Sequence, residues 1–173
     1  MGSNKKNGTD FETEFANLLS KYGFWVHKFA QRASGQPCDV IAVRKGRSFI
    51  FDCKDCELDC FTASRREENQ KLSMSLWNKC GNGFGWFAFR MSNKTIYIMD
   101  NIRLSTLLQK KKVLNKDDIR YNSMRFDAWL MVIMNGLKRD ESNNRKSDQN
   151  TESVPGSDGI LQEESCFDEP GIR

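Results

Sequence analysis

The feature of this sequence that most restricts its fold is the stretch from Pro37 to Asp55, PCDVIAVRKGRSFIFDCKD. Two apolar runs, VIAV and FIF, flank the polar segment RKGR, and this pattern predicts two antiparallel strands joined by a tight turn. One aspartate precedes the first run, a second follows the other run, and a lysine stands two residues further on. Because buried acids cost free energy unless they are paired, these charges need an explanation.

The turn chemistry sets the expected register of this hairpin. If the turn is centred on Lys45-Gly46, paired residues have numbers that sum to 91, and Asp39 lies directly opposite Asp52. Side chains alternate along a strand, so Lys54 shares a face with Asp52. We therefore expect the three charged groups at one end of the hairpin, an expectation that a slip of one residue would overturn.

Two opposed carboxylates repel each other and need a positive charge between them. Lys54 is one candidate, and a divalent cation is another, because Mg²⁺ binds oxygen ligands and often uses one or two carboxylates together with a substrate phosphate. This pattern favours metal-assisted hydrolysis of a phosphodiester, with Lys54 orienting the water or neutralising developing charge. Solvated strand-end acids paired with surface lysines are the alternative, and the spacing alone does not separate the two interpretations.

The distribution of charge indicates the class of partner. Residues 1–136 carry a net charge of +8 and residues 137–173 a net charge of −4, which together give the overall +4. A basic body favours a polyanion such as DNA. The run AWLMVIM is too short to span a bilayer and the first residues lack the apolar stretch of a signal peptide, so we expect a cytoplasmic protein that does not bind membranes.

The cysteines suggest a second kind of metal site. Cys53 and Cys56 have the spacing of zinc or iron–sulfur ligands, and Cys38, Cys80 or His27 would have to complete the set. No second close pair of cysteines accompanies them, so reduced thiols without a ligand role are the favoured interpretation. The single histidine excludes a paired-histidine metal site.

Hydrophobic periodicity predicts the remaining elements. We expect helices over residues 9–22, 64–80, 101–112 and 117–135, and strands over 23–30, the hairpin, 86–91 and 95–100. The order α-β-β-β-α-β-β-α-α predicts an α/β fold with a mixed sheet and helices on its faces. After Gly136 the apolar content almost disappears, which predicts one domain over residues 1–136 and a disordered acidic tail over 137–173. A docking peptide near the end of that tail is the alternative.

Two of the predicted helices carry further signals, a helix cap and apolar side chains at helical spacing. In the first helix, Thr9 and Glu12 match a capping box. Its expected apolar stripe consists of Phe11, Phe15, Leu18, Leu19 and Tyr22. In the second helix, Leu72, Leu76 and Trp77 are expected on the buried side.

Three stretches together resemble a known family. The pattern PCD…DCK resembles the PD-(D/E)XK nuclease superfamily, although Cys38 separates its Pro and Asp and the second acid is Asp rather than the commoner Glu. NGTDFETEF resembles the opening helix of Holliday junction resolvases of the RecU and archaeal Hjc types. EENQKLSM, followed by GFGWFAFRM and IYIMD, resembles the RecU segment after the catalytic lysine. The resemblance covers about residues 7–100.

This resemblance implies a restriction-endonuclease-like fold and a Mg²⁺-dependent endonuclease, active also with Mn²⁺, that resolves four-way DNA junctions as a homodimer. By position, the implied metal ligands are Glu12, Asp39 and Asp52, with Cys53 contributing at most its backbone carbonyl. The implied catalytic lysine is Lys54, and Gln70 is the helix glutamine that supports the site. Glu14 is the alternative to Glu12, and the position shortly after Gly8 favours Glu12.

The DNA-binding residues are less specific. Ser34 matches a serine that lies near the scissile phosphate in the archaeal resolvases, and the candidate phosphate contacts are Lys5, Lys6, Arg32, Arg65 and Arg66. Each of these charges has solvated surface charge as its alternative. Trp25 and Phe29, or the last helix, are candidates for the dimer interface. Two other functions remain open: another PD-(D/E)XK nuclease of repair or restriction, and a non-catalytic nucleic-acid-binding protein with a cysteine-rich zinc site.

Overall fold

The computed structural model describes the backbone of residues 3–30 and 36–151, and side chains over residues 10–30 and 36–140. The chain divides into two compact units, Met1–Lys138 and Arg139–Arg173. The predicted catalytic residues all belong to the first unit. No helix in the described part of the chain is long and apolar enough to cross a membrane.

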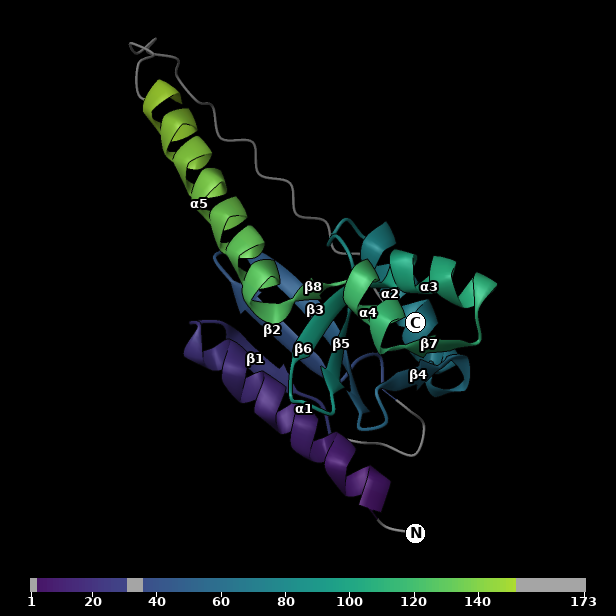
Figure 1. The fold of residues 1–173 in the computed structure, drawn as a ribbon. Helices are drawn as coiled ribbons and strands as arrows, with labels where there is room; N and C mark the ends of the chain where they lie inside the picture. Colours follow the sequence, from purple (N-terminus) through teal and green to yellow (C-terminus); the bar gives the residue numbers. More distant parts are fainter. Residues whose placement is uncertain (1–2, 31–35, 152–173) are drawn as a thin grey trace, which may run out of the picture. The chain divides into compact units, whose positions relative to one another are not determined.

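A six-stranded sheet forms the centre of the first unit (Figure 1). Its strands, in spatial order, are β1 (Trp25–Lys28), β2 (Val40–Arg44), β3 (Arg47–Cys56), β5 (Trp86–Met91), β6 (Ile96–Asp100) and β8 (Met124–Arg125). The β3–β5 pair is parallel and the other pairs are antiparallel. The predicted mixed central sheet is therefore confirmed.

The helices and a small second sheet complete the fold. The helices are α1 (Ser3–Lys21), α2 (Glu68–Lys79), α3 (Asn101–Lys110), α4 (Lys116–Asn122) and α5 (Phe126–Thr151). Strands β4 (Cys60–Thr62) and β7 (Val113–Asn115) pair with each other outside the main sheet. These two strands and β8 are additions to the predicted order of elements.

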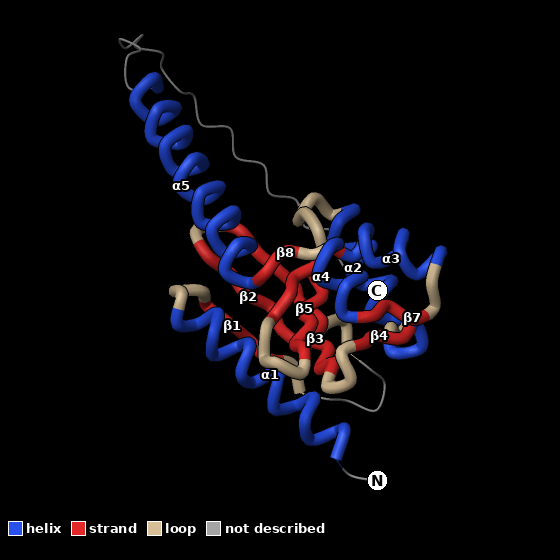
Figure 2. The backbone as a smooth tube through the Cα atoms, viewed as in Figure 1, coloured by secondary structure: helices blue, strands red, loops and turns tan. Residues whose placement is uncertain are grey.

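Two apolar cores lie on opposite faces of the main sheet, because successive side chains of a strand point to opposite sides. Phe51 and Cys53 of β3 join the first core with residues of α1 and of the first turns of α5. Ile50 and Cys56 join the second core, to which α2, α3 and α4 contribute. Figure 2 shows the red strands between α1 and the group formed by α2, α3 and α4.

The hairpin has the predicted turn and register over most of its length. Lys45 and Gly46 both have positive φ, 50° and 74°, as a two-residue hairpin turn requires. The pairs from Arg44–Arg47 to Val40–Phe51 have numbers that sum to 91, as predicted. The predicted Asp39–Asp52 pair is wrong, because the ladder ends at Val40 and the Asp39 N–H donates to the Phe51 carbonyl at 2.9 Å.

Both helices that the sequence analysis described begin elsewhere than predicted. Helix α1 begins at Ser3, so Thr9 lies inside it and the predicted capping box with Glu12 is wrong. Helix α2 begins at Glu68, and Glu67 and Gln70 form its capping box. Arg65 therefore belongs to a preceding turn of 3-10 helix (Ala63–Arg65), and helix α2 does not extend to residue 64 as predicted.

Helix α2 also presents a different face from the predicted one. Gln70 and Met74 are buried, whereas the side chains of Leu72 and Leu76 are 61% and 62% exposed. Gln70 points inward because it contacts a buried lysine of β3, and this contact leaves both leucines on the outer side of the helix. The predicted buried side is wrong for the two leucines, and Trp77 is partly buried as expected.

The predicted helix over residues 117–135 is two helices separated by a strand. The backbone becomes extended at Ser123, and Met124 and Arg125 then pair with Ile98 and Tyr97 of β6. Pairing with the open edge of β6 here outweighs the helical periodicity of the sequence. Helix α5 continues to Thr151, through a stretch with neither Gly nor Pro, into the segment for which the sequence predicted a disordered tail. Residues 152–173 lie outside the described part, and their disorder stays a prediction.

Candidate active site

Strand β3 places an acid and a lysine side by side on the face covered by α2. Asp52 is fully buried and Lys54 nearly so, and the Lys54 Nζ lies 2.7 Å from Asp52 Oδ2. Residues two apart on a strand point to the same face, so the alternation of the sequence already required this arrangement. A buried acid and lysine are thus held together at the end of the hairpin.

Helix α2 supplies the next contact through Gln70. Its Oε1 accepts a hydrogen bond from Lys54 Nζ at 3.2 Å and another from the Glu67 N–H at 3.3 Å. The same side-chain oxygen therefore closes the first turn of α2 and fixes the ammonium group of Lys54. Gln70 thus contacts the lysine that the family resemblance implied as catalytic, and its supporting role stays a prediction.

Asp39 reaches the same strand from the other side of the hairpin. Its Oδ2 accepts the Cys53 N–H at 2.7 Å, and its Oδ1 accepts the Gln36 side-chain amide at 2.5 Å. The Gln36 carbonyl in turn accepts Asn69 Nδ2 at 3.1 Å. Sequence reasoning missed Gln36 and Asn69, and the one available signal was that Asn69 directly precedes Gln70.

The electrostatics of Asp52 are unusual for an acid. Burial, together with the negative charge of Asp39, raises its pKa to about 8 from an ordinary value of 3.8, although Lys54 acts in the opposite direction. Asp52 Oδ1 is buried and accepts no hydrogen bond from the described residues. A buried carboxylate oxygen without a donor has capacity for a cation.

Glu12 approaches the site from α1. Its side chain is buried, and Lys28 Nζ lies 4.0 Å from its Oε2. The pKa of the Cys53 thiol is raised by burial and then by the charges of Asp39, Asp52 and Glu12. The charges of all three predicted acids thus act on the Cys53 thiol.

Glu14, the alternative to Glu12, has a different set of contacts. It forms an ion pair with Arg90 of β5, which also binds Asp55 of β3. Arg90 lies over the ring of Phe11 at 4.7 Å from its centroid. These contacts place Glu14 in an ion-pair network with Arg90 and Asp55, whereas the Glu12 carboxylate has Lys28 as a neighbour.

The donor set suits a hard divalent cation. Asp39 and Asp52 offer carboxylate oxygens, and Mg²⁺ commonly binds one or two carboxylates and takes its other ligands from water and phosphate. Among the described residues, no three His, Cys, Asp or Glu side chains gather closely enough to hold a metal ion by themselves. The residues present thus fit a cation that is completed by water and substrate.

The cysteines do not suit a zinc or iron–sulfur site. Cys53 and Cys56 belong to the two different cores, because they stand three residues apart on one strand. Burial raises the pKa of Cys56 to about 11 and that of Cys38 to about 12, which favours the protonated thiols. In the described part of the chain, the metal–thiolate alternative has no support.

The predicted DNA contacts are distributed differently. Arg66 donates to Ser105 Oγ at 2.9 Å and lies over Phe87, and burial lowers the pKa of its guanidinium. Arg65 donates to the Asp55 carbonyl at 2.9 Å. Both arginines therefore make internal contacts. Arg32 and Ser34 lie outside the described residues, as do the side chains of Lys5 and Lys6, and these four contacts stay predictions.

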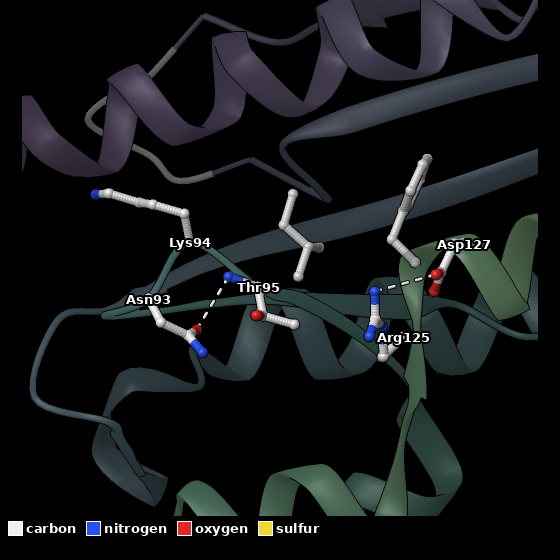
Figure 3. Close-up of a pocket in the computed structure, with 7 residues that line it drawn as sticks. Asn93, Lys94, Thr95, Arg125 and Asp127 are labelled. Atoms are coloured by element: carbon white, nitrogen blue, oxygen red, sulfur yellow. Dashed lines mark hydrogen bonds and ion pairs between the residues drawn. The ribbon is translucent and has the colours of Figure 1, made fainter.

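Two surface hollows lined by described residues lie away from this cluster of charges. Figure 3 shows one of about 340 Å³, lined by residues of the β5–β6 turn and the start of α5. Asn93 accepts the Thr95 N–H there at 3.1 Å, and Arg125 pairs with Asp127 at 3.1 Å. Another hollow, of about 370 Å³, lies beside the hairpin turn and includes Gly46 and Phe84. None of the predicted catalytic residues lines either hollow.

The arrangement of the sheet and helices is the restriction-endonuclease-like fold. The structure of Hjc from Archaeoglobus fulgidus, a Holliday junction resolvase, matches with a TM-score of 0.53 and 15% identity, over 69% of this chain and 92% of that one. The bacterial homing endonuclease I-Ssp6803I matches with a TM-score of 0.51 and 13% identity, over 80% of this chain and 99% of that one. These matches establish the fold alone.

The sequence establishes the family. The model of the Recombination protein U (RecU) family matches residues 26–137, so the chain belongs to this family, as its motifs predicted. A crossover junction endodeoxyribonuclease Hjc from Methanocaldococcus jannaschii is 29% identical over 93 residues, 54% of this chain. The match spans 65% of that relative's length. The family match begins after α1, so the helix that carries Glu12 lies outside it.

Proposed function

We propose that this protein is a Mg²⁺-dependent endonuclease that cleaves four-way DNA junctions. The observation that carries the proposal is the buried pair of Asp52 and Lys54, which is held by Gln70 beside Asp39 in a chain of the RecU family. A relative named for crossover-junction cleavage and a fold shared with a Holliday junction resolvase support the same substrate.

The cation would be held by Asp39 and Asp52, with Glu12 and the Cys53 carbonyl as further ligands. When bound, it supplies an activated water and stabilises charge on the phosphate. Lys54, fixed between Asp52 and Gln70, neutralises charge at the attacked phosphate. Because the pKa of Asp52 is raised to about 8, protons compete with the cation, and binding strengthens as pH rises toward that value.

A symmetric homodimer is part of this proposal, since paired cuts in a four-way junction need two active sites. Strand β1 lies at one edge of the sheet. Its Trp25 is 64% exposed and stacks on His27, which in turn contacts the ring of Phe29. This aromatic row is the surface that we propose for the dimer contact.

Lys5, Lys6, Arg32 and Ser34 remain the proposed contacts with the DNA backbone. Phosphate contacts of this kind make binding depend strongly on salt and carry little sequence information. Arg65 and Arg66 are weaker candidates, because their side chains already make internal contacts.

The test is cleavage of a labelled four-way junction and of a matching linear duplex by the wild type and by Asp52→Asn, with Mg²⁺, Mn²⁺ or EDTA. We expect paired symmetric nicks in the junction alone, and their loss with EDTA and in the variant. Equal cutting of both substrates would indicate a general nuclease of repair or restriction. Junction binding without cutting in either metal would indicate a non-catalytic DNA-binding protein.

A further inference from the structure

The first turn of α2 contacts both halves of the candidate site through two consecutive residues. Gln70 Oε1 accepts Lys54 Nζ at 3.2 Å, and Lys54 pairs with Asp52. Asn69 Nδ2 donates to the Gln36 carbonyl at 3.1 Å, and Gln36 Nε2 donates to Asp39 Oδ1 at 2.5 Å. Neighbouring side chains on a helix point in different directions, so one turn can hold two separate chain segments.

The two carboxylate oxygens of Asp39 accept hydrogen bonds from different kinds of donor. Asp39 Oδ2 accepts the N–H of Cys53, which belongs to a central strand. Asp39 Oδ1 instead depends on the side chain of Gln36, which precedes β2 and belongs to no strand or helix. The orientation of the carboxylate therefore depends on how firmly Gln36 is held, and Asn69 is the residue of α2 that holds it.

We propose that Asn69 and Gln36 are positioning residues of the cation site: Asn69 fixes the backbone of Gln36, whose side-chain amide orients the carboxylate of Asp39. This inference rests on the proposed function. Partners that orient a metal ligand reduce the freedom the ligand must lose on binding, and removing such a partner typically weakens metal binding by about 10- to 100-fold.

Helix α2 contains its own control for this contact. Asn78, near the other end of the helix, donates its Nδ2 to the Gly83 carbonyl at 3.1 Å. The two asparagines share a helix, a donor group, a bond length and a loop carbonyl acceptor. Only Asn69 leads to an acid of the site, so Asn69→Ala and Asn78→Ala separate positioning from general support of the helix.

The experiment measures Mn²⁺ binding to the DNA-free protein by electron paramagnetic resonance, together with thermal unfolding. The variants are Asn69→Ala, Asn78→Ala, Gln36→Ala and the double variant of Asn69 and Gln36. We expect about tenfold weaker Mn²⁺ binding in Asn69→Ala and Gln36→Ala and unchanged binding in Asn78→Ala. Because Asn69 acts through Gln36, the double variant should bind no more weakly than Gln36→Ala alone.

Two results would overturn the inference while the proposed function stands. One is wild-type protein that binds Mn²⁺ and cleaves junctions while Asn69→Ala binds Mn²⁺ as tightly or more tightly. The other is equal weakening in Asn69→Ala and Asn78→Ala in proportion to their loss of thermal stability. A wild type that neither binds Mn²⁺ nor cleaves DNA would overturn the proposed function itself, and the inference with it.

Discussion

Two clusters of charged and polar side chains surround strand β3, on opposite faces of the sheet. The site cluster consists of Asp52, Lys54, Gln70, Asp39 and Gln36, and the anchor cluster consists of Asp55, Arg90 and Glu14. Lys54 and Asp55 are neighbours in the sequence, yet each belongs to a different cluster because strand side chains alternate. In the anchor cluster, Arg90 binds both oxygens of Asp55, at 3.1 and 2.5 Å, and also pairs with Glu14.

The clusters differ in how completely their charges are satisfied. Arg90 forms a bidentate ion pair with Asp55, and these hydrogen bonds raise the pKa of the Arg90 guanidinium. Asp52 has its pKa raised to about 8 and keeps one buried oxygen without a donor from the described residues. Burial alone therefore does not distinguish a structural ion pair from a candidate catalytic one. The raised pKa of Asp52, together with its buried oxygen without a donor, is what makes the site cluster the candidate for chemistry.

The anchor cluster nevertheless serves the site. Arg90 connects β5 and β3 to Glu14 of α1, and Glu12 lies on the same helix. Glu14 anchors α1 to the sheet, and Glu12 is buried on the same helix. The choice of Glu12 over Glu14 as a metal ligand stays a prediction.

The largest expected effect is a loss of cleavage activity when a residue of the site cluster is substituted. Asp52→Asn should reduce junction cleavage by at least about 10²- to 10³-fold, because it removes a carboxylate ligand of the proposed cation, which stabilises the charge developing on the phosphate. Single-turnover cleavage with Mg²⁺ measures the loss, and circular dichroism confirms that the variant is folded. Cleavage within threefold of the wild type would place the chemistry elsewhere.

The anchor cluster should respond through stability. Asp55→Ala leaves the buried guanidinium of Arg90 with only Glu14, and breaking a buried ion pair costs about 3–5 kcal/mol of the free energy of unfolding. Urea unfolding measures the loss. Asp127→Ala, which removes an ion pair whose two side chains are both 66% exposed, is the control and should change stability little. Equal losses in the two variants would contradict the structural role of the anchor.

The raised pKa of Asp52 should make the stability of the protein depend on pH. Its pKa is near 8 in the folded protein and 3.8 ordinarily, so the folded state favours the protonated acid, and this contribution is lost as pH rises from about 4 to about 8. The stability of Asp52→Asn relative to the wild type should therefore rise over this range.

Asp59 provides a control of opposite sign. Contacts with Lys116 and Ser92 lower its pKa to about 2, so its contribution is present above pH 4 and lost as pH falls toward 2. Asp59→Asn should thus lose most stability, relative to the wild type, at neutral pH. Urea unfolding at a series of pH values measures both variants, and parallel profiles would contradict the assignment of Asp52.

The smallest expected effect concerns Gln70. Gln70→Met keeps the length of the side chain and removes the acceptor for both Lys54 and the Glu67 N–H, while Lys54 retains Asp52 as a partner. We expect about tenfold slower cleavage, since losing the hydrogen bond to the charged lysine costs about 1.5 kcal/mol, and a loss of thermal stability from the lost helix cap. The measurement is single-turnover cleavage, with Leu72→Met as the control on the exposed side of α2. Equal rates in the two variants would show that Gln70 does not support the lysine.

Local chemistry was enough to predict the centre of the site. The Lys45-Gly46 turn and the apolar runs beside it determined the register, and strand alternation then put Asp52 and Lys54 on one face. Motifs read along the chain also identified the family, and the strand over residues 86–91 was predicted with its correct bounds. These features depend on neighbours in the sequence, so periodicity and turn chemistry reveal them.

Contacts between distant segments were decided only by the tertiary structure. Asn69 meets Gln36 and Arg90 meets Asp55 across more than thirty residues of chain. The exposure of Leu72 and the break at Ser123 follow from the contact of Gln70 with Lys54 and the pairing of β8 with β6. Periodicity reports only that a helix has an apolar side. Which side is buried depends on the partner that packs against it, and that partner lies elsewhere in the chain.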